Sequence, residues 1–413
     1  MRFGSSIRAA LSSATPMKPF HRIHLIVMDS VGIGPASDAA EFGDEKAHTL
    51  GHISSAVGGL RLPFMRSLGL ANISDIERLP AVFNPAGCFA KMSPASRGKD
   101  TMTGHWELLG LRVDTPFRVF PHGFPDQLIS AIKMHSGRGV IGNKAASGTE
   151  IIAELGEEHL RSGALIVYTS SDSVLQIAAH EEAVPLAELY AICEFCRALT
   201  TAEPYQLGRV IARPFVGSKG AFRRTANRHD YALKPFAPTT LNVLRNAGLD
   251  VIGLGKISDI FAGEGITRSI RTSSNAEGML RLTELASESF HGLSFLNLVD
   301  FDALHGHRRD ALGYARALEE FDAQLEVFCA QQPASDLILI TADHGNDPTH
   351  SGTDHTRENV PLLAASKSFS VGRSLGTRET FADVAATIAD NFQVTPPLSG
   401  VSFLKDLVLT QSF

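Results

Sequence analysis

The chain has 413 residues, a formal net charge of -6 and 44% hydrophobic residues, which excludes one small core and indicates two domains or one large α/β domain with an insertion. The mild acidic excess argues against a nucleic-acid-binding protein, because such proteins usually present a basic face. No apolar run reaches the ~20 residues of a membrane span, so no membrane partner is expected either.

Short apolar runs alternate with helical patterns, which predicts a mainly parallel sheet flanked by helices. The first 20 residues are interpreted as an extension, expected to be disordered, and a transit peptide is the alternative. Apolar stripes at steps of three and four residues predict helices over 311–330 and 380–392. The predicted strands are 24–29, 164–170, 251–255, 293–300 and 337–343.

The middle of the chain differs in character, because Pro and Gly interrupt it often and an Arg-rich stretch lies at 223–230. We interpret residues 116–234 as an inserted α+β cap domain, with 21–115 and 235–413 forming one core. Cys193 and Cys196 are interpreted as thiols on one face of a helix. Four cysteines in so long a chain favour a reducing compartment, and a cytoplasmic location is predicted.

Three predicted strands end in acidic residues. Residues 24–29 end at Asp29, the strand over 293–300 is followed by Asp302, and 337–343 ends at Asp343. Such acids lie at the carboxyl edge of a sheet, where open α/β folds bind ligands. One such Asp usually caps a turn or a helix, but three strand ends are harder to explain in that way.

Histidines accompany these acids, and neutral imidazole together with carboxylate suits Zn²⁺ or Mn²⁺, with Mn²⁺ favoured as carboxylates increase. Two such ions at ~3.5–4 Å are a recurrent arrangement for displacement at phosphorus. The sequence therefore predicts a site for two divalent cations with six candidate ligands: Asp29, Asp302, His307, Asp343, His344 and His355.

A candidate nucleophile lies in the segment SRGKDTMTGHWELLG, residues 96–110. Thr101 and Thr103 both precede a helical pattern, and the N-terminus of a helix favours a phosphoryl group. A hydroxyl beside a metal ion can be activated for attack. Alternatively, both threonines cap the helix. Physical reasoning alone does not choose between Thr101 and Thr103.

From about residue 22 to its end, the chain resembles the prokaryotic phosphopentomutase family of the alkaline phosphatase superfamily. Acids and histidines at strand ends mark only the superfamily, whereas the long sequence blocks are specific to the family. The matching blocks are DSVGIGPASDAAEFGD, GKDTMTGHWE, YTSSDSVLQIAAHEE, GRVIARPF, NRHDYALKPF, GKISDI, NLVDFDALHGHRRD and TADHGNDPTHSGTDHTRE.

The resemblance implies an alkaline-phosphatase-like core with two Mn²⁺ ions and an isomerase of nucleoside catabolism that interconverts ribose 1-phosphate and ribose 5-phosphate, or the deoxyribose forms. One ion would be held by Asp29, Asp343 and His344, and the other by Asp302, His307 and His355. Thr101 would carry the phosphoryl group after priming by a sugar bisphosphate such as glucose 1,6-bisphosphate.

The resemblance also implies contacts with a pentose phosphate substrate. Arg209 and Lys256 match positions that bind phosphate, Asp172 would meet the sugar hydroxyls, and Arg224 is a further candidate. The alternative functions are a related two-metal phosphohydrolase or a phosphoglycerate mutase of the same superfamily, and a binding protein without activity. A monomer or weak homo-oligomer is expected.

Overall fold

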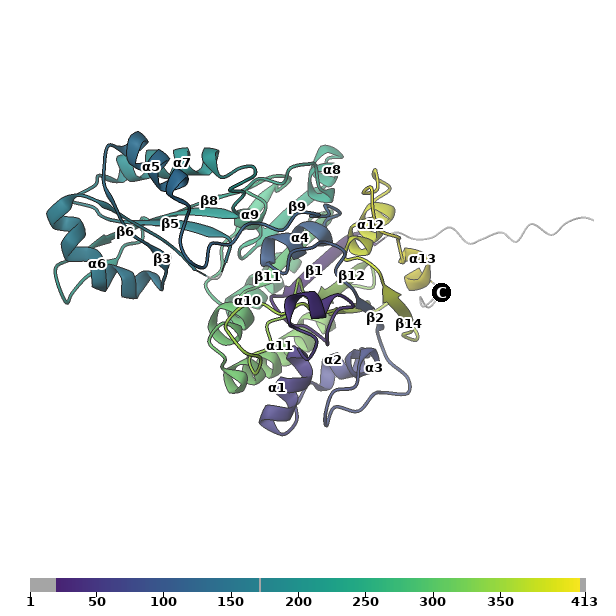
Figure 1. Ribbon diagram of the computed structural model, residues 1–413. Helices are drawn as coiled ribbons and strands as arrows, with labels where there is room; N and C mark the ends of the chain where they lie inside the picture. The colour runs from purple at the N-terminus through teal and green to yellow at the C-terminus, as the bar shows by residue number, and fades with distance from the viewer. Residues whose placement is uncertain (1–19, 171, 409–413) are drawn as a thin grey trace, which may run out of the picture.

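The computed structural model describes residues 20–170 and 172–408. The expected extension over residues 1–20 therefore lies outside the described residues, except for Phe20. Within the described ranges the chain forms two sheets, each covered by its own helices, and Figure 1 shows them as two bodies side by side.

The larger sheet has eight strands in the described part of the chain, in the order β10-β9-β11-β1-β12-β13-β2-β14. Every neighbouring pair is parallel except the two that include β13. The predicted mainly parallel sheet is thus confirmed. Its strands are β1 (Arg22–Met28), β2 (Cys88–Met92), β9 (Asp250–Leu254), β10 (Arg268–Ile270), β11 (Gly292–Leu298), β12 (Asp336–Thr341), β13 (Val360–Ala365) and β14 (Ser374–Arg378).

Helices cover both faces of this sheet, as its buried strands require. The helices on one face include α1 (Thr49–Val57), α2 (Pro63–Ser67), α10 (Asn275–Ala286) and α11 (Ala311–Gln331). The group around α4 on the other face consists of α4 (Thr101–Leu108), α8 (Thr240–Asn246), α9 (Ile257–Ile260) and α12 (Ala382–Asn391). Shorter elements complete the core: 3-10 helix η1 (Ala39–Phe42), α3 (Leu70–Ile73), π-helix η2 (Phe301–Gly306) and α13 (Leu404–Val408).

The smaller sheet has six strands in the described part, with β3-β4-β5-β6-β7 in order and β8 paired to β6. Side chains alternate between its faces, so one face packs against α5 and α7 and the other against α6. Its elements are α5 (Asp126–Ser136), β3 (Val140–Ala145), α6 (Gly148–Ser162), β4 (Leu165–Thr169), β5 (Val174–His180), α7 (Leu186–Leu199), β6 (Arg209–Val216), β7 (Arg223–Arg224) and β8 (His229–Ala232).

We call this second body the cap domain, because all of its elements fall inside the predicted range 116–234. The boundaries themselves stay a prediction. Cys193 and Cys196 are buried on α7, where burial raises the pKa of both thiols and makes them inert. Within the described residues, no helix combines the length and apolar character that crossing a membrane would require.

Candidate metal centre and nucleophile

The acidic strand ends of the core sheet lie next to one another. Strands β11, β1 and β12 are adjacent and parallel, so their carboxyl ends share one edge. Asp29 directly follows β1, Asp302 lies in η2 just after β11, and Asp343 and His344 follow β12. The local pattern of apolar strands that end in acids therefore brings distant residues to a single place.

The first candidate metal site consists of Asp29, Asp343 and His344. Their ligand atoms all lie within 4.8 Å of one another. His344 Nε2 is 3.4 Å from Asp29 Oδ1 and 3.4 Å from Asp343 Oδ2. All three side chains are buried. This is the same set that the family resemblance implied, although the assignment as metal ligands stays a prediction.

The donor atoms of this site suit a cation. Asp29 Oδ1 is buried and accepts no hydrogen bond from the described residues, and Asp343 Oδ2 contacts only imidazole nitrogens without hydrogen-bond geometry. Burial, followed by the charge of Asp343, raises the pKa of Asp29. Burial acts in the same sense on Asp343, but interactions with the neighbouring His344 and His105 side chains outweigh it and lower the pKa of Asp343. A divalent cation would satisfy these crowded oxygens.

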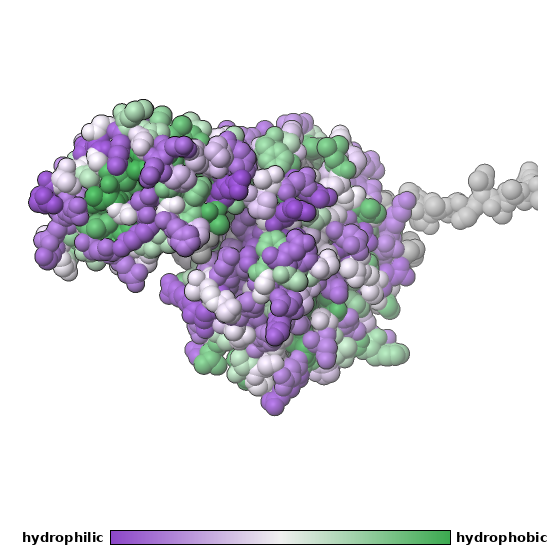
Figure 2. Space-filling view, in the orientation of Figure 1, coloured by the Kyte–Doolittle hydropathy of each residue, from purple (hydrophilic) through white to green (hydrophobic). Residues whose placement is uncertain are grey.

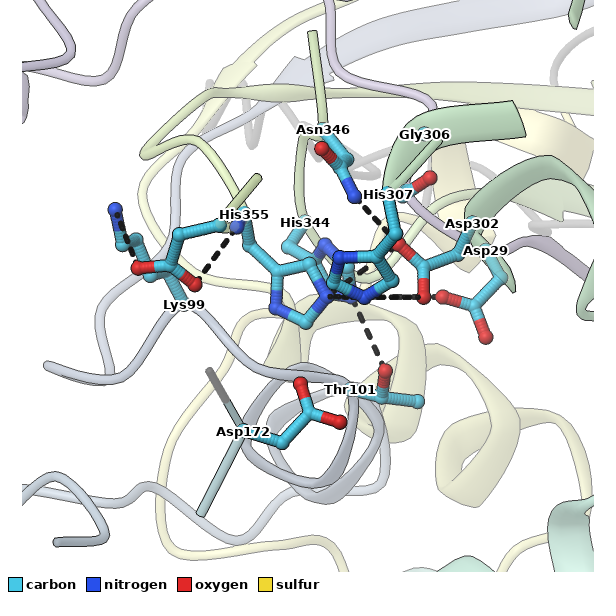
Figure 3. Close-up of polar contacts among 12 residues, drawn as sticks. Asp29, Lys99, Thr101, Asp172, Asp302, Gly306, His307, His344, Asn346 and His355 are labelled. Atoms are coloured by element: carbon cyan, nitrogen blue, oxygen red, sulfur yellow. Dashed lines mark hydrogen bonds and ion pairs between the residues drawn. The ribbon is translucent and has the colours of Figure 1, made fainter. Parts of the chain in front are cut away.

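The second candidate site centres on two facing imidazoles, His307 and His355, whose Nε2 atoms are 3.1 Å apart (Figure 3). Asp302 reaches both, with Oδ2 3.2 Å from His307 Nε2 and Oδ1 3.3 Å from His355 Nε2. His307 Nδ1 donates to the Thr353 carbonyl oxygen at 2.7 Å, which leaves Nε2 for a ligand bond. Burial lowers the pKa of His307, but the Asp302 carboxylate outweighs this and raises it to about 9.

Asp172 is a further carboxylate at the second site. It lies in the cap domain between β4 and β5, and one of its oxygens, with the His307 and His355 nitrogens, forms a group within 4.8 Å. Figure 3 shows Asp172 on the Thr101 side of the imidazoles. We favour Asp302 as the resident ligand because it contacts both imidazoles, while Asp172 also lies 3.5 Å from Arg209.

The donors at both sites are carboxylates and imidazoles, without a thiol, and this set suits Mn²⁺ or Zn²⁺. The described residues thus contain two candidate metal sites, in agreement with the expected number of ions. The identity of the metal stays a prediction.

The two candidate nucleophiles differ in their surroundings. Thr103 is buried, and its Oγ1 donates to Asp100 Oδ2 at 2.6 Å. Asp100 is itself the N-cap of α4, because its side chain accepts from Thr103 N, so neither threonine has the capping role considered above. Thr101 Oγ1 lies 3.2 Å from His344 Nε2 (Figure 3). The hydroxyl that faces the metal centre is therefore that of Thr101.

A cavity of about 510 Å³ lies between the core and the cap domain, within the size range of small-molecule sites. Hydrophilic side chains border the notch between the two bodies in Figure 2. The cavity is lined by Thr101 and by residues of both bodies, among them Asp29, Asp172, Arg209, Arg228, Asp230, Lys256, Arg271, Asp302, His307 and His355.

Three of the four predicted substrate contacts line this cavity, namely Asp172, Arg209 and Lys256. Desolvation by the surrounding protein lowers the pKa of Lys256, although the charge of Asp29 opposes this shift. Arg224 is not among the lining residues. It lies exposed on β7, which pairs with the far end of β6 from Arg209.

Two further arginines line the cavity, and the sequence analysis missed both. Arg271 directly follows β10, a three-residue strand that the sequence analysis did not predict, so the strand-end rule could not reach it. Arg228 belongs to the Arg-rich stretch, and Asp230 receives its bidentate hydrogen bonds at 2.7 Å. No sequence signal distinguishes Arg228 from its neighbours in that stretch.

The described geometry agrees with comparisons to known proteins. The family model of the metalloenzyme superfamily matches residues 21–396, and the chain belongs to this superfamily. Its α/β fold, with a mainly parallel sheet and a separate smaller one, is the fold class expected from the sequence.

Similar solved structures share little sequence identity with this chain. The PH0037 protein of Pyrococcus horikoshii is 13% identical, with a TM-score of 0.48 and coverage of 93% of this chain and 100% of that one. A phosphoglycerate mutase of Leishmania mexicana is also 13% identical, with a TM-score of 0.46 and coverage of 94% of this chain and 98% of that one. A protein of the alkaline phosphatase superfamily from Vibrio parahaemolyticus is 8% identical, with a TM-score of 0.39 and coverage of 91% of this chain and 66% of that one.

Proposed function

We propose that this protein is a phosphopentomutase, which interconverts ribose 1-phosphate and ribose 5-phosphate, or the 2-deoxyribose forms. The observation that supports this most is that the cavity has two chemically different sides. The candidate metal sites and Thr101 belong to the core, while Arg209 and Arg228 belong to the cap domain. A mutase needs both, because its substrate carries a phosphate at one end while a hydroxyl at the other receives the phosphoryl group.

The proposed cycle starts from phospho-Thr101, formed with a sugar bisphosphate primer. The free hydroxyl of the pentose phosphate attacks the phosphorus, the bond to Thr101 Oγ1 breaks, and a pentose bisphosphate results. The sugar then reverses its orientation in the cavity. Thr101 Oγ1 then attacks the phosphorus of the other phosphate, the bond from that phosphorus to the sugar oxygen breaks, and the product leaves with a free hydroxyl at that carbon, which restores phospho-Thr101. When bound, two Mn²⁺ ions would stabilise charge on the transferring phosphoryl group and activate the attacking oxygens.

The residues of the cavity would bind and orient the sugar phosphate. Arg209 and Lys256 would hold the phosphate that is not transferred, since ionised donors make the strongest hydrogen bonds to phosphate. Asp172 would accept hydrogen bonds from the sugar hydroxyls. The cap domain would exclude water, so that a sugar hydroxyl rather than water receives the phosphoryl group. Arg224 could contribute only after a rearrangement, given its exposed position on β7.

A direct assay tests the reaction. Purified protein is incubated with ribose 1-phosphate, Mn²⁺ and a hexose 1,6-bisphosphate primer, and ribose 5-phosphate and inorganic phosphate are both measured. We expect ribose 5-phosphate to form without a matching release of phosphate. Inorganic phosphate without ribose 5-phosphate would instead identify a phosphohydrolase, and turnover of phosphoglycerate alone would identify the other mutase.

The phosphoryl carrier is tested by intact-protein mass measurement before and after exposure to the bisphosphate primer. We expect the wild type to gain one phosphate, Thr101→Ala to gain none, and Thr101→Ser to gain one because it retains a hydroxyl. Thr103→Ala is the matched control within the same motif and should still gain one. A phosphate that persists in Thr101→Ala would refute the assignment.

A further inference from the structure

Two buried polar side chains lie behind the first candidate metal site. His105 lies in α4, one turn after Thr101, with 0% of its surface exposed, and Asn297 lies in β11 with 2% exposed. The His105 ring stacks on Phe295, with centroids 5.7 Å apart. Neither His105 nor Asn297 is among the residues that line the cavity, so a role for either must act through other residues.

The contacts of His105 indicate the tautomer of its ring. Its Nδ1 lies 2.9 Å from the Thr101 carbonyl oxygen and 3.0 Å from Asp343 Oδ2. The Thr101 carbonyl oxygen is an acceptor, so Nδ1 carries the hydrogen, and the Asp343 carboxylate makes a close electrostatic contact with the same nitrogen. On the other side of the ring, His105 Nε2 lies 3.4 Å from Asn297 Nδ2. Because the amide nitrogen is a donor, Nε2 accepts, and these contacts together fit the tautomer that carries its hydrogen on Nδ1.

The orientation of the Asn297 amide follows from its second contact. Asn297 Nδ2 donates to Asp29 Oδ2 at 2.9 Å, so its two hydrogens serve Asp29 and His105. Turning the amide over would place Oδ1 against the Asp29 carboxylate. The observed orientation leaves Asn297 Oδ1 buried without a partner among the described residues, which is energetically unfavourable. A function in holding the Asp29 carboxylate explains why Asn297 occupies this position although its Oδ1 is buried and unpaired.

We propose that Asn297 and His105 are positioning residues, which together fix the carboxylates of Asp29 and Asp343 for cation binding. The chain of contacts runs from Asp29 through Asn297 and His105 to Asp343, and it also ties the backbone of Thr101 to the same pair. Outer partners of this kind orient metal ligands, and their loss typically costs 10–100-fold in metal affinity. The inference rests on the candidate metal site, and it holds for any phosphate ester substrate.

The test is a titration of metal-depleted protein with Mn²⁺, with free Mn²⁺ measured by electron paramagnetic resonance. His105→Phe keeps the ring and its stacking but removes both nitrogens, and we expect one of two Mn²⁺ sites to weaken by about 10–100-fold. The other site should change by less than about threefold. His105→Asn retains a side-chain N–H near the Nδ1 position and should recover most of the affinity.

Asn297→Leu provides a second, independent route, and it carries the test if His105→Phe does not fold. We expect the double variant to lose little more affinity than either single one, because both act through the same contacts. His291→Phe, an exposed histidine at the opposite end of β11, is the matched control and should bind like the wild type. Thermal unfolding in the presence of a chelator checks the fold of each variant.

Wild-type affinity at both sites in folded His105→Phe and Asn297→Leu would overturn the proposal, and so would an equal loss at both sites. The titration contains no sugar phosphate. A protein that shows the expected loss at one site but no mutase activity would therefore refute the proposed function and leave this inference standing.

Discussion

Asp336 shows how strongly one buried carboxylate can depend on its partners. It begins β12, at the end of the strand away from the metal centre, and is 1% exposed. Arg22 Nη2 lies 2.6 Å and His24 Nε2 3.2 Å from Asp336 Oδ2. Burial opposes ionisation, but hydrogen bonds from His24 and Arg22 outweigh it and lower the pKa of Asp336. Its contribution to stability is therefore present above the unfolded-state pKa and disappears as the pH falls through the folded-state value.

Replacing Asp336 by Asn should accordingly reduce the free energy of unfolding by about 3–5 kcal/mol at pH 7, because Arg22 would remain buried without its anion. The gap between variant and wild type should begin to narrow below about pH 3.9, the pKa of Asp in the unfolded state, and should narrow further as the pH falls through the lower folded-state pKa. Denaturant unfolding across this pH range measures the difference in the free energy of unfolding between the variant and the wild type. Asp114→Asn, at an exposed ion pair, should cost less than about 1 kcal/mol, and a gap that widens in acid would contradict the interpretation.

At the scale of the element, α4 is the part that places Thr101. Trp106 Nε1 donates to the Ile260 carbonyl oxygen at 3.0 Å, which joins α4 to the end of α9. Glu107 is buried and accepts hydrogen bonds from Ala95 N and Ser96 N and from residues at the start of α12. Gly104 packs so closely on the Asp343 backbone that a Cβ atom there would overlap the carbonyl oxygen. The absence of a side chain at Gly104 allows the nucleophile helix to approach the metal centre.

Gly104→Ala should therefore displace α4 from β12 and reduce turnover by about 100-fold, the effect of a shift of ~1 Å in a reacting group. Gly278→Ala in α10 is the matched control. A Cβ there would meet only the ends of leucine side chains, at 3.1 Å or more, and turnover should be retained. Steady-state rates at saturating Mn²⁺ measure the effect, and a Gly104→Ala variant as fast as the wild type would show that α4 can move without consequence.

At the scale of the whole molecule, the cavity belongs to neither sheet alone. The metal centre and Thr101 come from the core, and Arg209 enters from the first residue of β6 in the cap domain. A substrate in the cavity would thus bridge the two bodies. Its affinity should depend on residues of the cap domain that have no part in metal binding.

Arg209→Met should raise the KM for ribose 1-phosphate by about 10–100-fold, the equivalent of the 1.5–3 kcal/mol of a hydrogen bond to a charged group. Mn²⁺ affinity should not change. The control is Arg223→Met, at an exposed position on β7, which should keep the wild-type KM. Initial rates over a range of substrate concentrations give the KM of each variant. An unchanged KM in Arg209→Met would show that Arg209 does not bind the substrate.

Local pattern was sufficient to predict the mainly parallel sheet and the meeting of Asp29, Asp302 and Asp343 at one edge, whereas the grouping of Asp29 with Asp343 and His344 came from the family resemblance. In an apolar strand that ends in an acid, the acid marks the carboxyl end of the strand, so three such segments predict that their acids lie at one edge of the sheet. The antiparallel strand β13 escaped prediction, because Val360–Ala365 is an apolar run whose direction depends on its neighbours β12 and β2. Direction of this kind is a property of the assembled sheet.

The supporting shell of the site could not be predicted for a related reason. His105 meets Asp343 and Asn297, which are far away in the chain, and a buried histidine inside a helix looks like any core residue until those contacts form. The exposed position of Arg224 could not be predicted either, because β7 is only two residues long and shows no alternation of polar and apolar residues. The choice of Thr101 over Thr103 required the family resemblance and now agrees with the observed hydroxyl positions.

The division between core and cap domain has a consequence for how such a protein can change over time. The six predicted metal ligands and Thr101 lie in the core segments, whereas Asp172, Arg209 and Arg228 lie in one uninterrupted insertion. Selection acting on the insertion can thus alter which molecule is held while the reactive centre is inherited unchanged. Exchange of residues 116–234 between relatives is the corresponding laboratory operation, and it offers a route to enzymes with new substrates and an old chemistry.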